Sequence, residues 1–113
     1  MTNVEVTVTP AQITIEMIGH ADYAEKGNDI VCSAISTLEY IVAGWCEMNP
    51  EKAIVKKYEI EPGYSFMKLI PIGNDVYNIV EAAVIGFMGI AERYPENIKL
   101  KKVWKSGRNP DIK

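Results

Sequence analysis

The chain has 113 residues and a formal net charge of −3, a size that suits one domain with one hydrophobic core. Apolar residues make up 48% and charged residues 24%, which excludes a disordered chain. Apolar runs stay far below the roughly 18 residues of a membrane span, and no secretory signal opens the chain. Two cysteines are too few for a disulfide-stapled secreted scaffold. We therefore expect a reduced, cytoplasmic, single-domain protein that does not engage a membrane.

Charge is unevenly distributed along the chain. Residues 99–113 carry six basic side chains against Asp111, a net charge of +5, whereas residues 1–98 carry 6 basic and 14 acidic side chains, a net charge of −8. An acidic body favours basic partners and disfavours nucleic acid. The basic end is compatible with RNA contact, but a solvated last strand followed by a frayed tail over 105–113 explains it equally well.

Hydrophobic periodicity predicts the first half of a domain that spans residues 1–104. Apolar residues alternate with polar ones over 3–9 and again over 13–17, which indicates an opening hairpin. A helical pattern then runs from about Asp29 to Met48. Asn49-Pro50 ends it, because the residue before a proline avoids the helical region.

The second half repeats the same order of elements. Strands over 53–61 and 64–70 flank Pro62-Gly63, which suits the central positions of a type II turn. A second helix is capped by Asn74 or Asp75 and ends near Arg93, and a last strand covers Ile98–Trp104. The predicted fold is α+β, with the order β-β-α-β-β-α-β, and its five-stranded mixed sheet carries both helices on one face.

Helical phase predicts which side of the first helix is buried. Its apolar stripe comprises Ile30, Val31, Ala34, Ile35, Leu38, Ile41, Val42 and Trp45. Cys32 lies on another side, which it shares with Ser36, Glu39 and Ala43, so we expect it to face the preceding loop. Cys46 lies beside the edge of the stripe and is interpreted as a packing residue.

The segment from Gly19 to Ser36 contains the residues suited to chemistry. His20, the only histidine, ends a strand, and Cys32 stands in the first turn of the next helix. The helix dipole and free backbone N–H groups there favour a thiolate, and those N–H groups can donate to an oxyanion. A Cys–His pair of this kind performs nucleophilic catalysis. A buried cysteine and a strand-end histidine that bonds the loop are the simpler structural alternatives.

Four further residues have two interpretations each. Asp29 can cap the helix or orient His20, and the cap is the safer prediction. Ser36 can support the cysteine or bond back within its helix. Gly19 and Gly27 can be hinges of a loop that closes over substrate, or simply allow the turns.

Other kinds of site have little support. The chain lacks a glycine-rich phosphate loop, a serine nucleophile elbow and paired histidines at metal-ligand spacing. His20, Asp22 and Glu25 could imitate only a weak metal site. We expect neither a metal nor an organic cofactor.

The run Gly19-His20-Ala21, then Gly27, then Asp29-Ile30-Val31-Cys32 and Ser36, resembles the ribosomal-processing cysteine protease family, Prp. The hairpin over 58–64 and the exit over 94–99 also fit this family. Two departures are Ser33, where the family more often has alanine, and the tail over 105–113. The resemblance implies a catalytic dyad of His20 and Cys32.

The resemblance also implies a substrate and an assembly. It describes a homodimeric endopeptidase that removes an N-terminal extension from large-subunit ribosomal protein twenty-seven, cutting after an aromatic pair. The acidic body suits such a basic substrate. Phage structural proteins with a similar leader are alternative substrates. A ribosome-associated binding protein that keeps the fold without peptidase activity is the alternative from another class.

Overall fold

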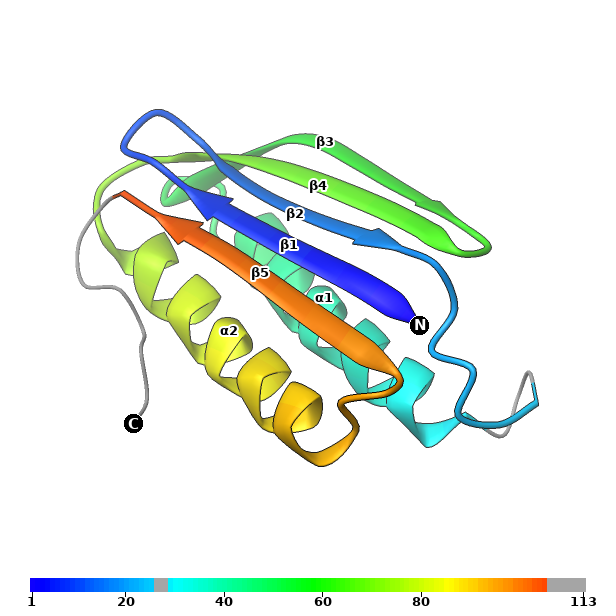
Figure 1. Cartoon of the computed structure of the whole chain (residues 1–113). Coiled ribbons are helices and arrows are strands. Elements are labelled where there is room, and N and C mark those ends of the chain that lie inside the picture. Colours follow the sequence, from blue (N-terminus) through cyan, green and yellow to red (C-terminus); the bar gives the residue numbers. More distant parts are fainter. Residues whose placement is uncertain (26–28, 106–113) are drawn as a thin grey trace.

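The computed structural model describes residues 1–25 and 29–105, and Figure 1 labels its elements. They follow the predicted order and agree closely with the predicted ranges. In chain order they are β1 (Thr2–Val8), β2 (Ile13–Ile18), α1 (Ile30–Met48), β3 (Ala53–Glu61), β4 (Tyr64–Pro71), α2 (Asp75–Arg93) and β5 (Ile98–Trp104).

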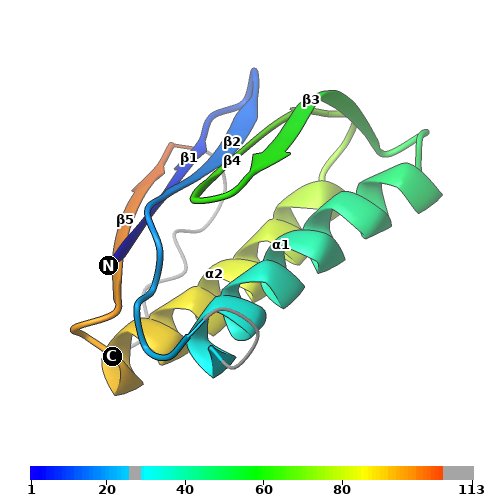
Figure 2. The same ribbon diagram turned by 90° about the vertical axis from the view of Figure 1, so that its right-hand side faces the viewer.

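The sheet is mixed, as predicted. Its strand order is β3-β4-β2-β1-β5, in which only β1 and β5 pair in parallel and the other neighbours pair antiparallel. Both helices cover the same face of the sheet, so the molecule has two layers (Figures 1 and 2). The Lys105 N–H still donates to the Val8 carbonyl over 2.7 Å, so pairing continues one residue beyond the predicted domain end. The remainder of the predicted tail, 106–113, lies outside the described residues.

The core fills the space between the two layers. Alternate residues of β1, β2 and β4 are buried, as the period-2 pattern predicts. Phe87 of α2 is the largest fully buried side chain and packs within this core. The strand residues buried with it are Val4, Val6, Val8, Ile13, Ile15, Met67, Leu69 and Ile98.

The predicted buried side of α1 is only partly correct: Val31, Ile35 and Val42 are buried as expected. Ile30 and Ile41 are 55% and 46% exposed, whereas Glu39 and Ala43 are only 5% and 3% exposed. The helix carries apolar residues on more than one side, so hydrophobicity alone did not fix its rotation. A polar residue could join the buried side because hydroxyl groups of the sheet bond to Glu39.

Cys32 is exposed, as predicted, but for a different reason from the one that helical phase suggested. Cys32 shares its side of α1 with Glu39 and Ala43, and that side turns towards the sheet. Cys32 is nevertheless exposed, because a cavity lies beside the first turn of the helix.

By length and composition, α1 would be able to cross a membrane, and it alone meets this criterion within residues 1–25 and 29–105. A core helix of a folded domain passes the same test. Figure 2 shows α1 beside α2 on one face of the sheet, and the core residues of α1 are Val31, Ile35, Val42, Ala43 and Cys46.

The turn and cap predictions are confirmed with one difference. Gly63 has φ +73°, the left-handed value expected at the second central position of the turn. Asn74 occupies the N-cap position of α2, but its side chain forms no cap hydrogen bond. Asp75 instead pairs with Lys52, with 3.1 Å between carboxylate and ammonium.

Truncating the core should destabilise the fold strongly. We expect Phe87→Ala to lower the free energy of unfolding by about 3–5 kcal/mol, since it leaves a cavity between the layers. Urea unfolding followed by circular dichroism measures this. Ile85→Ala is the control on the same helix, where the side chain is 40% exposed, and should cost below about 1 kcal/mol. Equal losses for both variants would contradict the assigned core.

Candidate active site

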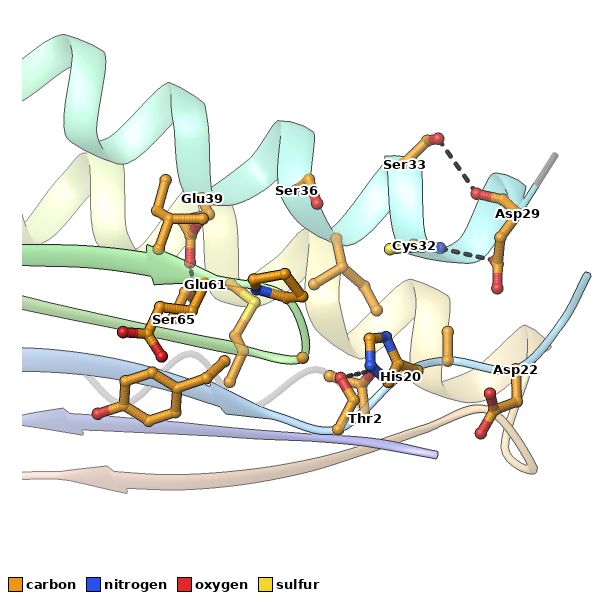
Figure 3. A pocket seen from close by; sticks show the side chains of 18 of the residues that line it. Thr2, His20, Asp22, Asp29, Cys32, Ser33, Ser36, Glu39, Glu61 and Ser65 are labelled. Carbon is orange, nitrogen blue, oxygen red and sulfur yellow. Dashed lines mark hydrogen bonds between the residues drawn. The ribbon is translucent and has the colours of Figure 1, made fainter. Parts of the chain in front are cut away.

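A cavity of about 760 Å³ lies at one end of the two layers. The end of β2, the first half of α1 and the tip of the β3–β4 hairpin enclose it (Figure 3). Both His20 and Cys32 line it, which brings together two residues that the sequence analysis selected. Asp29 and Ser36 also line it, as does Gly19. Gly27 lies outside the described residues.

Asp29 fixes the beginning of α1. One carboxylate oxygen, Oδ1, accepts the Cys32 backbone N–H over 2.9 Å, which confirms the predicted N-cap. The other oxygen, Oδ2, accepts the N–H groups of Tyr23 at 3.0 Å and Ala24 at 3.4 Å. The same carboxylate therefore ties the loop after β2 to the helix that carries the cysteine. None of these bonds reaches the His20 imidazole, so the geometry supports the cap and not the orienting role.

These contacts shift the acidity of Asp29. Burial raises its pKa, but the hydrogen bonds from Cys32, Tyr23, Ala24 and Val31 outweigh that effect and lower the pKa below its ordinary value of 3.8. The hydrogen bonds at the start of α1 also correct the expectation that backbone N–H groups there donate to an oxyanion. The Cys32 N–H donates to the Asp29 carboxylate and the Ser33 N–H donates to the Asp29 carbonyl, so neither is free for an oxyanion.

The two cysteines have opposite environments. Cys32 is a free, exposed thiol at the third residue of α1. Cys46 is only 1% exposed and belongs to the core, as predicted. Burial, with a smaller contribution from the Glu47 charge, raises the pKa of Cys46 to about 11.

His20 lies against the tip of the β3–β4 hairpin. The Gly19 N–H donates to the Gly63 carbonyl over 2.8 Å, which joins the end of β2 to the turn. A Cβ atom at Gly63 would lie only 2.8 Å from His20 Nε2, so a glycine lets the turn approach the imidazole closely. His20 and Cys32 face each other from opposite walls of the cavity (Figure 3), and no hydrogen bond joins them in the part of the chain described.

Gly19 has a local reason to be glycine. Its φ is +101°, and a Cβ atom there would collide with the Met1 carbonyl oxygen. The loop that follows is anchored at several points. The Tyr23 ring meets the Tyr94 ring edge to face at 5.3 Å, and Asn97 Nδ2 donates to the Ala21 carbonyl over 2.9 Å. A hinge role for Gly19 and Gly27 stays a prediction.

The other polar residues singled out from the sequence lie near the cavity, but none of them bonds to Cys32 or His20 in the described part of the chain. Ser33 Oγ donates to the Asp29 carbonyl over 3.1 Å, so this departure from the family pattern bonds within its own helix. Ser36 is exposed on the cavity wall one turn after Cys32. Asp22 pairs with the Met1 amino group at 3.1 Å. Across residues 1–25 and 29–105, no three His, Cys, Asp or Glu side chains gather closely enough to hold a metal ion.

Glu39 is a cavity residue that the sequence pattern did not reveal. Its carboxylate accepts hydrogen bonds from the Ser65 and Tyr58 hydroxyls, the latter over 3.3 Å, and lines the cavity beyond Ser36 (Figure 3). The available signal was a single acidic residue in the middle of an apolar helix. Its partners lie 19 and 26 residues away along the chain, on β3 and β4, so the pairing itself was not visible.

A thiol in the first turn of a helix, opposite an imidazole across a peptide-sized cavity, is the arrangement of a cysteine peptidase. Residues 1–99 match the family described as Cysteine protease Prp, and the chain belongs to that family. It is a cysteine protease of the ribosomal-processing class.

Relatives and solved structures support this assignment. The ribosomal processing cysteine protease Prp of Mycoplasma genitalium is 33% identical over 84 residues, which cover 74% of this chain and 82% of that protein. The crystal structure of Prp from S. aureus with a covalently linked product peptide superposes with a TM-score of 0.76 at 27% identity, over 90% of this chain and 99% of that one. SMU.848 from Streptococcus mutans gives a TM-score of 0.71 at 26% identity, over 93% and 96%.

Removing the charge of Asp29 should make stability less dependent on acid. Because the pKa of Asp29 is lower in the folded state, its contribution is present above pH 3.8 and is lost as pH falls through the folded pKa. We expect Asp29→Asn to lower the free energy of unfolding at pH 7 by about 1 kcal/mol. Urea unfolding between pH 7 and pH 3 should show this difference shrinking in acid. A difference that grows in acid would contradict the assignment.

Adding a methyl group at Gly63 should displace His20. Gly63→Ala strains a left-handed residue and drives its Cβ into the imidazole. We expect the peptidase kcat/KM to fall at least about tenfold, roughly 1.4 kcal/mol, and the pH profile of Cys32 alkylation to change.

The matched control is Gly73→Ala. Gly73 has φ +75°, and nothing lies within 4 Å of a Cβ placed there. This variant should lose similar stability and keep both the peptidase activity and the pH profile. Similar losses of activity in the two variants would show that strain alone, and not His20, is responsible.

Proposed function

We propose that this protease removes the N-terminal extension of large-subunit ribosomal protein twenty-seven during ribosome assembly in the cytoplasm. The observation that carries the proposal is the exposed Cys32 thiol at the start of α1, facing His20 across the cavity. The relative from Mycoplasma genitalium is named a ribosomal processing protease, and Prp from S. aureus holds a covalently linked product peptide. The acidic body of this chain suits a basic ribosomal substrate.

In the proposed reaction, His20 takes the proton of the Cys32 thiol, and the thiolate attacks the carbonyl carbon of the scissile bond. The tetrahedral intermediate collapses as His20 returns the proton to the leaving amine, and the acyl group stays on sulfur as a thioester. His20 then deprotonates a water molecule that attacks the thioester and releases Cys32 as a thiol. The positive end of the α1 dipole stabilises negative charge at Cys32 during these steps.

The proposal requires no metal or cofactor and includes a homodimer. The surface of α1 supports the dimer, because Ile30 and Ile41 are about half exposed and Met48 is 83% exposed on the same side of the helix. An exposed apolar surface of this kind is typical of a protein contact. Contact with RNA through the basic C-terminal end stays a prediction, since 106–113 lie outside the described residues.

Mass spectrometry of the extended ribosomal protein, after incubation with this protein or with Cys32→Ala, tests the proposal. We expect cleavage at one site by the parent protein and at least a thousandfold loss in the variant, about 4 kcal/mol of transition-state stabilisation. If the extended ribosomal protein is intact and accessible but is not cut, it is not the substrate of this protease. A leader-bearing phage structural protein or a non-catalytic binding role would then be favoured.

Thiol alkylation separates a peptidase from a binding protein. Near pH 7 we expect iodoacetamide to modify Cys32 rapidly and Cys46 hardly at all, because burial raises the pKa of Cys46 to about 11. Peptide mapping after timed alkylation measures both rates. In His20→Ala the rate at Cys32 should fall, with Cys46→Ala as the control that keeps it. A Cys32 rate that is no higher than that of a free cysteine, and insensitive to His20→Ala, would favour the binding protein.

A further inference from the structure

Glu39 is a buried acid on the wall of the active-site cavity. It lies on α1 two turns beyond Cys32 and is 5% exposed. The carboxylate points from the helix towards β4 (Figure 3). Each of its oxygens accepts one hydroxyl, Oε2 from Ser65 and Oε1 from Tyr58.

This carboxylate has no cationic partner. Buried charges in proteins are ordinarily paired, because burial removes their hydration. Within residues 1–25 and 29–105, Glu39 takes part in no ion pair. After burial, the charge of Glu39 is the next cause that raises the pKa of Tyr58, to about 12. The two hydroxyls orient the carboxylate, and neither of them supplies a positive charge.

The rest of the cavity has the same sign of charge. The described residues that line it include no lysine and no arginine. Its other acidic side chains are Asp22, Glu25, Asp29 and Glu61. A cleft lined by charges of one sign concentrates their electrostatic field. A cationic group is therefore attracted most strongly to the carboxylate that is least hydrated, which is Glu39.

The position of Glu39 sets where a peptide would meet it. Seven residues of α-helix between Cys32 and Glu39 span about 10 Å. An extended peptide advances about 3.3 Å per residue, so about three residues of substrate cover this distance. The long aliphatic stem of a lysine or arginine would lie against the cavity wall, and its charged end would reach the carboxylate.

We propose that Glu39, held by Ser65 and Tyr58, forms a specificity subsite for a lysine or arginine side chain of the substrate, about three residues from the scissile bond. This inference rests on the proposed peptidase function and names a feature of its substrate. The position of Cys32 determines which peptide bond is cut. Glu39 determines which of the peptides that reach Cys32 are preferred.

A series of fluorogenic decapeptides with one fixed cleavage site tests the subsite. A single lysine is moved through four positions on each side of the bond, and norleucine, of nearly equal length without charge, replaces it in the matching peptide. We expect lysine to raise kcat/KM at least about tenfold over norleucine at one or two positions. In Glu39→Gln this ratio should fall to about one.

Glu47→Gln is the matched control, since it makes the same change on an exposed side chain of the same helix, outside the cavity. It should keep the preference for lysine. Glu39→Leu is the second variant, used if Glu39→Gln does not fold, because leucine suits the buried side of α1. Equal cleavage of lysine and norleucine peptides at every position, or a preference that survives both Glu39 variants, would overturn the subsite.

Binding separates this inference from the proposed function. Fluorescence anisotropy measures the affinity of the same peptides for Cys32→Ala, alone and combined with Glu39→Gln. A binding preference for lysine that depends on Glu39, without cleavage of any peptide by the parent protein, would sustain Glu39 as a site for a basic side chain and contradict the proposed reaction of Cys32 and His20. Cleavage without a preference for lysine would sustain the proposed reaction and refute the subsite. If the parent protein neither cleaves the peptides nor prefers lysine in binding, the reaction and the subsite are both refuted.

Discussion

The carboxylate of Asp29 is the contact on which the site depends. It caps α1 through the Cys32 N–H and at the same time holds the N–H groups of Tyr23 and Ala24. A helix N-terminus exposes unsatisfied donors, and a loop needs partners for its own backbone. One anion meets both needs, which positions the turn that carries Cys32 relative to the strand that presents His20.

The two-layer architecture then leaves the cavity open at one end. The sheet and helices bury a continuous core, but at this end the cavity separates the first turns of α1 from the end of β2 and the hairpin tip (Figure 3). At this end Gly63 approaches His20 so closely that a side chain would not fit. The site is therefore assembled by backbone contacts between segments that are far apart in the chain, which gives it more rigidity than a loop alone would have.

Charge adds selectivity to this geometry. Cys32 and His20 lie in a cavity whose other charged side chains are all acidic among the described residues, and Glu39 puts a carboxylate without a cationic partner at its far end. In a peptidase, a carboxylate that is held in place and poorly hydrated discriminates between substrates more strongly than exposed acids do. The low net charge of the whole chain, −3, conceals this local concentration of negative charge.

Local patterns in the sequence determined the order of the elements, the turn at Gly63, the cap at Asp29 and the placement of Cys32 in the first turn. Each of these depends on residues only a few positions apart, so periodicity and capping chemistry are sufficient. Only the tertiary structure decided which side of α1 is buried, because the helix has apolar residues on several sides and its rotation is set by α2 and the sheet. It also decided that Glu39 meets Ser65 and that Gly63 meets His20, since those contacts join segments that fold from distant parts of the chain.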